Sequence, residues 1–449
     1  MALPAGFFFG RLAAPLAHPK HHDEQVCVAN LSVRYGGLDL GRDVMVISQA
    51  EQVERLHGLD ALRAGALLLG VLLHASLSFF PQQIWIVADD SRSIGAAWLF
   101  FAIHLFRMTA FFLIAGLFAH RMLTRQGWVA FAKDRVVRIA GPLAAFWFPV
   151  MAGIVTALVW NAHANGLVTP GAPPPPPPTY EWTNFPLTHL WFLWALTLFY
   201  AVVLIVRAVL GVLDRAGRAG PVVDRIIGAL IGPWTPAALA APLALALWLD
   251  PTWIAFFAVP TPDAGVIPNT SALVGFGLAF GLGFALDRRR DLLGRIAKGA
   301  PLFLSMALVS GVAAYVLAGG PSIAPMGEPT AGKALAAAVT AVAVFASALA
   351  ATGLCLRFAS GHSPVRRYLS DASYWIYIVH LPLVMLAQVW VQDWAGPWWV
   401  KLIGVSAGVL AVCLASYELL IRHSFMGRWL NGRRVPWRNR PAPALVPAE

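Results

Sequence analysis

About ten stretches of the sequence are apolar over roughly twenty residues each, which is the length at which an α-helix crosses the hydrocarbon core of a bilayer. The chain is 58% hydrophobic, and only 12% of its 449 residues are charged. A soluble protein carries about twice that share of charge. The sequence therefore predicts an all-α, polytopic membrane protein with about ten transmembrane helices. The predicted spans are 59–80, 94–119, 138–160, 189–212, 234–257, 270–286, 301–319, 333–356, 370–391 and 398–421.

The loops between these spans alternate in charge. Turns such as "HRMLTRQGWVAFAKDR" and "DRRRDLLGRIAK" are rich in Arg and Lys, whereas loops such as "AVPTPDAGVIPNT" carry no basic residue. By the positive-inside rule both termini are predicted to be cytoplasmic. The formal net charge of +11 is spread over these short clusters, so it indicates topology and predicts no nucleic-acid partner.

The pattern predicts three regions. A transmembrane domain occupies residues 55–425, after a poorly specified cytoplasmic extension at 1–54 and before a basic cytoplasmic tail at 426–449. Translation from Met45 is an alternative to Met1, because the coherent pattern begins only near residue 51. Nothing in the composition indicates an oligomeric state.

Several ionisable residues fall inside the predicted spans. Arg63 and His74 lie eleven positions apart, so at about 100° per residue they share one helix face and are separated by about 16 Å along the axis. Each ionisable group at bilayer depth costs at least about 2.5 kcal/mol, so several together predict a cavity or a site. The other candidates within the spans or at their ends are Asp60, His104, Arg107, His189, Tyr377, His380, Glu418 and Arg422.

Simpler explanations exist for some of these residues. Arg107 and His74 are predicted to lie too deep to reach the membrane surface, so they are the strongest candidates for function. An interfacial position is the lesser alternative for His189, whereas packing or support of Arg107 accounts for His104 better than a ligand role does. Snorkelling to the inner surface accounts for an isolated charge near that surface, which here applies to Asp60, Arg63, Glu418 and Arg422.

Common catalytic and cofactor motifs are absent from the sequence. There is no HExxH, no HxxxH within a span, no glycine-rich phosphate loop before a helix and no GxSxG. The sequence therefore predicts no metal site and no permanently bound cofactor.

Five stretches resemble a known family in order and spacing. They are Arg63-x10-His74, "LFRMTAFFLIAGLFA" at 105–119, "HLWFLWAL" at 189–196, "SYWIYIVHLPLV" at 373–384 and "SYELLIR" at 416–422. Together with the helix count, they resemble the integral-membrane acyltransferase family 3, and within it the branch taken to place succinyl groups on periplasmic glucans. The similarity covers roughly residues 52–425.

The resemblance implies a function. Such an enzyme is an acyltransferase of the bacterial inner membrane that moves an acyl group, succinyl or acetyl, from cytoplasmic acyl-CoA to hydroxyls of a periplasmic glucan. The bilayer, the glucan and acyl-CoA are the implied partners. Succinyl is implied by the resemblance alone.

The residues can be given roles within that chemistry. Arg63 at the inner mouth would meet the CoA phosphates, for which guanidinium groups are suited. His74 would act as general base on the acceptor hydroxyl. Arg107 would stabilise the oxyanion or bind the far carboxylate of a dicarboxylic acyl group.

The remaining candidates are assigned to the pocket or to the acceptor. They form two pairs, His189 with Trp191 and His380 with Tyr377. A carboxylate that orients His74 is also expected, but the spans hold none at depth. Residues of the outer loops could serve only if those loops fold inward; they are Glu181, Asp89 and Asp90. Direct transfer and an acyl-histidine relay both remain open.

Three other functions are alternatives to this one. An O-acetyltransferase of another cell-envelope glycan would use the same residues. A proton-coupled anion transporter could use the same Arg and His groups, although such transporters often carry internal repeats and residues 59–257 show no self-similarity with 270–421. A scaffold protein would leave His74 and Arg107 unexplained.

Overall fold

The computed structural model describes residues 40–168, 179–432 and 435–436, with side chains from residue 57 onward. The chain divides into two units, of which the second begins at Glu51 and contains every helix discussed below except the start of the first. Most of the predicted amino-terminal extension and the end of the basic tail lie outside the described residues.

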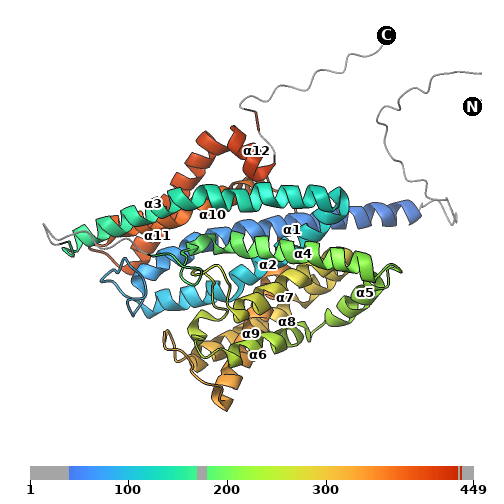
Figure 1. Cartoon of the computed structure of the whole chain (residues 1–449), viewed down its shortest axis with the longest axis horizontal. Coiled ribbons are helices and arrows are strands. Elements are labelled where there is room, and N and C mark those ends of the chain that lie inside the picture. Colours follow the sequence, from blue (N-terminus) through green and yellow to red (C-terminus); the bar gives the residue numbers. More distant parts are fainter. Residues whose placement is uncertain (1–39, 169–178, 433–434, 437–449) are drawn as a thin grey trace, which may run out of the picture. The chain divides into compact units, whose positions relative to one another are not determined.

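Helices make up nearly all of the regular structure in the described ranges (Figure 1). The α-helices are α1 (Leu40–Ser76), α2 (Ile94–Arg135), α3 (Gly141–Ala164), α4 (Trp191–Leu213), α5 (Ala219–Leu230), α6 (Thr235–Leu249), α7 (Thr270–Arg288), α8 (Asp291–Leu317), α9 (Ala331–Phe358), α10 (Pro364–Val391), α11 (Trp398–Ser416) and α12 (Phe425–Asn431). Short 3-10 turns are η1 (Leu77–Phe79), η3 (Thr188–Leu190) and η4 (Ala255–Phe257), and π-helical turns are η2 (Val136–Ala140) and η5 (Tyr417–Ile421).

The membrane-spanning prediction is confirmed at the level of fold class. Eight helical segments of the described residues are long and apolar enough to cross a membrane, or nine when the bent pair α5 and α6 is counted as one span. One of the eight, Ile94–Ala164, is 71 residues long and contains both α2 and α3. Each of the ten predicted spans therefore coincides, in whole or in part, with one helix of the structure.

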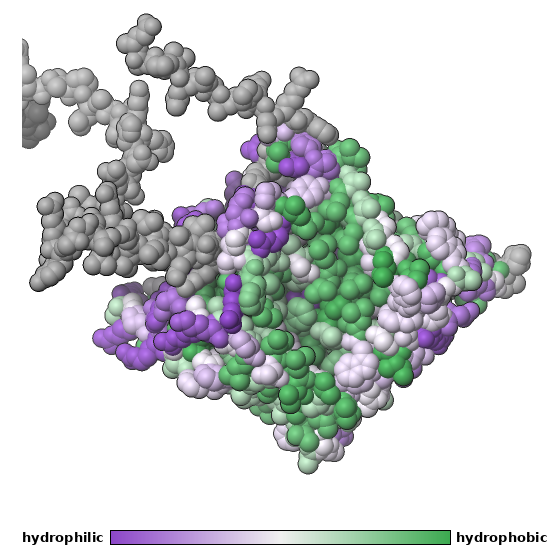
Figure 2. All heavy atoms as spheres, turned by 180° about the vertical axis from the view of Figure 1, so that it is seen from behind, coloured by the Kyte–Doolittle hydropathy of each residue, from purple (hydrophilic) through white to green (hydrophobic). Residues whose placement is uncertain are grey.

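The surface fits a bilayer environment. Figure 2 shows a broad area of hydrophobic residues on one face, with hydrophilic residues gathered toward its sides. Large apolar side chains such as Phe148, Leu308 and Val309 are mostly exposed in the middle of their helices. Such a surface is stable only against lipid, so the protein is a multi-pass membrane protein. We call the end of the bundle that carries the basic turns the inner end.

Glycines set the closest helix contacts in the bundle. A Cβ at Gly116 of α2 would collide with the backbone of Phe280 in α7, and one at Gly283 of α7 would collide with the backbone of Leu113. Small residues allow helix backbones to approach in this way where lipid removes the hydrophobic drive for association. The α2–α7 contact holds α2, which carries Arg107, in place.

One predicted span was wrong at its end. The stretch 234–257 was predicted to be helical throughout, but α6 ends at Leu249, where Asp250 is extended and precedes Pro251. A proline disfavours helical backbone in the residue before it, so the apolar run cannot continue as helix. The remaining residues fold back into the protein as a loop that contains η4 and buries Trp253 and Phe256.

Several helices extend beyond their predicted bounds, and two short helices, α5 and α12, were not predicted. α2 continues past 119 to Arg135 with a break at Gly127, whose φ of 77° is favourable only for glycine. α8 begins at Asp291 and includes Pro301 inside it. The amphipathic α5 lies in a stretch that the loop charges indicated only as a basic turn.

We expect Gly283→Val to destabilise the protein by about 1–3 kcal/mol or more, because the added side chain must push α7 away from α2. Gly281→Val is the matched control, since a Cβ at Gly281 meets nothing within 4 Å. Thermal unfolding of the two variants in detergent measures the difference. Equal stability of both variants would contradict the packing assigned to this contact.

Candidate active site

A cavity of about 1010 Å³ lies inside the bundle. Its walls come from α1, α2, α4, α10 and the loop after α6. Along α1 it extends from Arg63 to Leu77, so it reaches from the inner end of the bundle to the outer loops. Arg63 and His74 both line it, as their shared helix face predicts.

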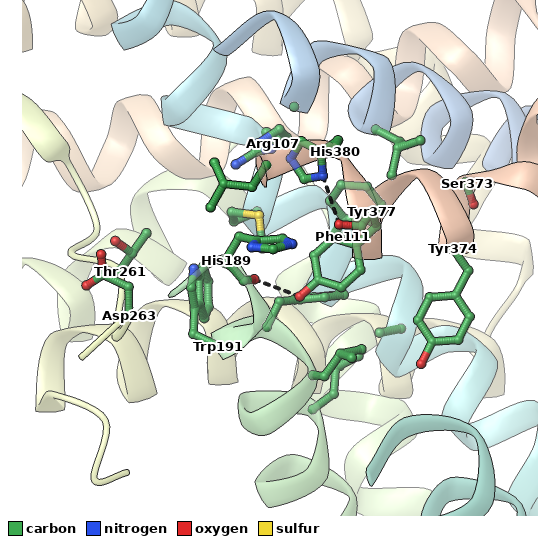
Figure 3. Close-up of a pocket in the computed structure, with 18 of the residues that line it drawn as sticks. Arg107, Phe111, His189, Trp191, Thr261, Asp263, Ser373, Tyr374, Tyr377 and His380 are labelled. Atoms are coloured by element: carbon green, nitrogen blue, oxygen red, sulfur yellow. Dashed lines mark hydrogen bonds between the residues drawn. The ribbon is translucent and has the colours of Figure 1, made fainter. Parts of the chain in front are cut away.

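Three histidines meet in the outer half of this cavity. The ring centroids of His74 and His380 are 5.2 Å apart, and those of His380 and His189 are 5.1 Å apart. The residues come from α1, α10 and η3, which are remote in the sequence. Figure 3 shows His189 and His380 with Arg107 on the same side of the cavity. We call His74, His189 and His380 the histidine cluster.

A proline in α10 creates the partner that holds His189. Pro382 has no N–H, so the carbonyl of Ile378, four residues earlier, has no helical donor. The Nε2 of His189 lies 3.0 Å from that carbonyl oxygen, and both groups are buried. Since a carbonyl only accepts, the Nε2 atom of His189 must carry the proton. The hydroxyl of Tyr377 adds a second link, donating to the backbone oxygen of His189 at 2.7 Å (Figure 3).

His380 is fixed in one tautomer by the same logic. Its Nδ1 lies 2.8 Å from the carbonyl oxygen of Tyr377, so Nδ1 carries the proton and neutral Nε2 has a free lone pair. This Nε2 is buried and has no hydrogen-bond partner among the described residues. The Nδ1 of His74 is likewise buried and without a partner there. The cluster thus presents proton-accepting atoms to the cavity.

Arg107 is a buried cation without a carboxylate. Its guanidinium lines the cavity and packs against Gly70 of α1, one turn before His74, in a space that any side chain at position 70 would fill. No ion pair to Arg107 occurs in the part of the chain that the structure describes. An uncompensated guanidinium at this depth favours the binding of an anion.

The inner end of the cavity is lined by arginines. Arg63 bonds the backbone oxygen of Ser370 at 3.2 Å and also its hydroxyl, and its distance from Asp60 is 3.5 Å. Arg121 and Arg125 also line the cavity, on the part of α2 that was predicted to be a loop. Neither makes an ion pair within the described ranges. Sequence reasoning used these two only for topology; their i, i+4 spacing is the signal that places them on one face.

Comparison with known proteins identifies the family of the chain. The model of the acyltransferase domain family matches residues 56–418. The chain belongs to this family. The Glucans biosynthesis proteins C of Escherichia coli K12 and of Shigella dysenteriae serotype 1 are each 33% identical to it over 90 residues, which is 20% of this chain and 23% of each relative. The match thus spans about a quarter of the length of these relatives. No solved structure matches the chain.

The other predicted residues of the acyltransferase fall into two groups. His104 and Trp191 line the cavity: His104 stacks on Phe100 at 5.2 Å between centroids, and Trp191 stacks on Phe276 at 5.3 Å. The second group lies outside its lining and consists of Asp60, Glu181, Glu418 and Arg422.

The residues outside the cavity have other contacts. At the inner end of the bundle, the Nη1 atom of Arg422 donates to both carboxylate oxygens of Glu418, each at 2.9 Å. Glu181 is exposed in the outer loop. Asp60 borders a smaller hollow beside Arg63, lies 3.5 Å from that arginine and accepts from the hydroxyl of Ser370 at 3.4 Å.

Asp89 does not orient His74. Its carboxylate lies 2.7 Å from the Nζ of Lys401, and both side chains are almost completely buried. The second bond of Lys401, to the backbone oxygen of Gln392, ties the outer loop to the segment that joins α10 and α11. Asp90, the other candidate in this loop, is exposed.

Gln388 makes hydrogen bonds beside the histidine cluster that the sequence did not predict. Its amide nitrogen donates to the backbone oxygens of His74 and Ala75 at 3.0 and 3.2 Å, and its oxygen accepts from Trp85 at 2.9 Å. These bonds satisfy carbonyls at the end of α1. They hold His74 at a defined height relative to α10.

We expect Asp89→Asn to destabilise the acyltransferase by about 3–5 kcal/mol, because Lys401 would remain buried without its counter-ion. Asp90→Asn removes a neighbouring exposed carboxylate and should leave stability unchanged. Thermal unfolding in detergent measures both. A stable Asp89→Asn protein that lacks activity would instead indicate that Asp89 has a catalytic role.

Proposed function

We propose that this membrane acyltransferase transfers an acyl group from a cytoplasmic acyl-CoA to a hydroxyl of a cell-envelope glycan on the outer side of the bacterial inner membrane. The observation that carries the proposal is a single cavity with arginines at its inner end and the histidine cluster in its outer half. The family match supports acyl transfer, and the likeness to Glucans biosynthesis protein C supports a glucan as the acceptor.

The donor would enter from the inner end. Arg63, Arg121 and Arg125 present guanidinium groups to that part of the cavity, and such groups bind phosphates through paired hydrogen bonds. The pantetheine arm would follow the α1 face toward His74, about 16 Å further out by helix rise. The thioester would then reach the histidine cluster while the nucleotide part stays at the inner end.

The histidine cluster would activate the acceptor. His74 takes the proton from the acceptor hydroxyl as its oxygen attacks the thioester carbonyl carbon. The carbon–sulfur bond then breaks, and the thiolate receives that proton to leave as free CoA. The free Nε2 lone pair of His380 would stabilise the protonated ring of His74, in the place where a carboxylate was expected.

Arg107 would stabilise the negative charge of the reaction. Its unpaired guanidinium can donate to the oxyanion of the tetrahedral intermediate inside a water-poor cavity. The same group could hold the far carboxylate of a succinyl chain. Succinyl is the acyl group that the resemblance of the sequence motifs implies, and we propose it as the natural one.

The purified protein distinguishes this function from anion transport. Release of CoA thiol that requires both acyl-CoA and a glucan oligosaccharide supports transfer. Acylated product with the mass of a succinyl rather than an acetyl group supports the proposed donor. Anion uptake into vesicles without thiol release would support the transporter.

We expect His74→Gln to lower the transfer rate by about 100-fold or more, because a general base contributes that much. His163→Gln is the matched control: His163 is exposed near the outer end of α3, away from the cavity. Rates per folded protein, measured by thiol release, compare the two. Full activity of His74→Gln would move the role of base to His380 or His189.

We expect the double variant Arg121→Gln/Arg125→Gln to raise the KM for acyl-CoA about tenfold, since two phosphate-binding charges are removed. Arg207→Gln/Arg225→Gln removes the same charge from exposed sites outside the cavity. With acyl-pantetheine, which lacks the nucleotide phosphates, the first variant should match the wild type. An equal loss with both donors would contradict the phosphate assignment.

A further inference from the structure

The outer rim of the cavity is built by two loops that pair with each other. Pro186 and Ala264 form an antiparallel bridge, and the amide of Gly265 donates to the oxygen of Phe185 at 2.9 Å. Gly265 has a φ of 80°, and a Cβ there would lie 2.8 Å from the carbonyl oxygen of Thr183. The close pairing of these loops therefore requires glycine at this position.

This pairing places Asp263 beside the histidine cluster. The backbone oxygen of Asp263 accepts from the amide of Thr188 at 2.9 Å, and Thr188 directly precedes His189. Thr188 has a φ of 51°, which is costly for a β-branched residue and is kept only where the surroundings enforce it. Figure 3 shows Asp263 and Thr261 together at one side of the cavity that His189 and Trp191 also line.

The carboxylate of Asp263 has no cation or hydroxyl partner among the described residues, and only backbone N–H groups of Asp263 and Ala264 act on it. Two other acids of the outer loops are occupied within the protein, and neither of them lines the cavity. Asp89 pairs with Lys401, and Asp250 accepts from the hydroxyl of Thr252 at 2.7 Å. Asp263 is thus a free acceptor that faces the cavity where the acceptor substrate must enter.

We propose that Asp263, together with the hydroxyl of Thr261, binds hydroxyl groups of the acceptor and so positions the reacting hydroxyl at the histidine cluster. A carboxylate has two oxygens and can accept from two neighbouring sugar hydroxyls at once. The largely buried Trp191 lines the same cavity and makes the wall there apolar. This inference rests on the proposed function and names the subsite for its acceptor.

Partial desolvation by the surrounding loops raises the pKa of the Asp263 carboxyl above its ordinary value, although the residue is exposed at the rim and the two backbone N–H groups act in the opposite direction. The charged form accepts hydroxyl protons at both oxygens, whereas the protonated form gives up part of that capacity. The KM for the acceptor should therefore rise as the pH falls through this raised pKa. The other charged or titratable groups of the cavity's outer half are His74, His104, Arg107, His189, Tyr377 and His380.

The test uses the purified full-length protein with acyl-CoA and a glucan oligosaccharide. We expect Asp263→Asn to raise the KM for the oligosaccharide about tenfold or more, as for loss of hydrogen bonds to a charged group, with the KM for acyl-CoA unchanged. The acceptor KM of the wild type should rise at low pH, whereas the acceptor KM of Asp263→Asn should not show this rise. Thr261→Val should raise the acceptor KM severalfold and provides a second variant if Asp263→Asn folds poorly.

Glu181→Gln is the matched control, because it removes an exposed carboxylate from the neighbouring outer loop without altering the cavity. Its acceptor KM should equal that of the wild type. An unchanged acceptor KM in both Asp263→Asn and Thr261→Val would overturn the subsite while leaving the proposed function intact. Absence of transfer by the wild type would overturn the proposed function itself and the subsite with it.

Discussion

The hydrogen bond from His189 to the carbonyl of Ile378 is the contact on which the arrangement of the site depends. It exists because Pro382 leaves that carbonyl without a donor, and in lipid an unsatisfied backbone oxygen costs several kcal/mol. The imidazole removes this cost, and the same bond fixes its tautomer. It also joins the start of α4 to the middle of α10, which places His189 and His380 with ring centroids 5.1 Å apart. Pro382 thus determines the tautomer of His189 and how closely the start of α4 approaches α10.

Arg107 differs from His189, because its polar group has no partner among the described residues. Its guanidinium lies inside the bundle with no carboxylate partner among the described residues, so its positive charge carries an electrostatic cost. Packing elsewhere must offset that cost, and the close glycine contacts between α2 and α7 hold the helix that carries Arg107. An anion that enters the cavity lowers the cost, whether it is a carboxylate or the oxyanion of an intermediate. Stabilisation that appears only when negative charge develops is the kind that accelerates a reaction.

The sequence predicted the helices of this protein better than it predicted the loops of the site. Apolar length determines where a chain can cross lipid, so each predicted span meets a helix, and helix rise and angle were enough to place Arg63 and His74 on one cavity wall. The end of α6 was missed because apolar composition outweighed the Asp250–Pro251 signal. Asp89 was considered as a partner of His74 because its pairing with Lys401, more than 300 residues away in the chain, leaves no local pattern. Asp263 was missed for the same reason, since only the pairing of two distant loops brings it to the cavity.

The two ends of the cavity differ in the chemistry they can recognise. Guanidinium groups at the inner end suit phosphates, whereas the free carboxylate and hydroxyl at the outer end suit sugar hydroxyls and would repel a phosphate. Under the proposed function, a donor and an acceptor with these properties would not exchange places, so the charges at the two ends would impose a direction on the transfer. The histidine cluster lies where the two substrates would meet, and Gln388 and Pro382 hold it there through backbone contacts that no exposed charge can disturb. In the proposed reaction, direction would require no large movement of the protein, because only the acyl chain would cross the membrane, along the wall that α1 forms.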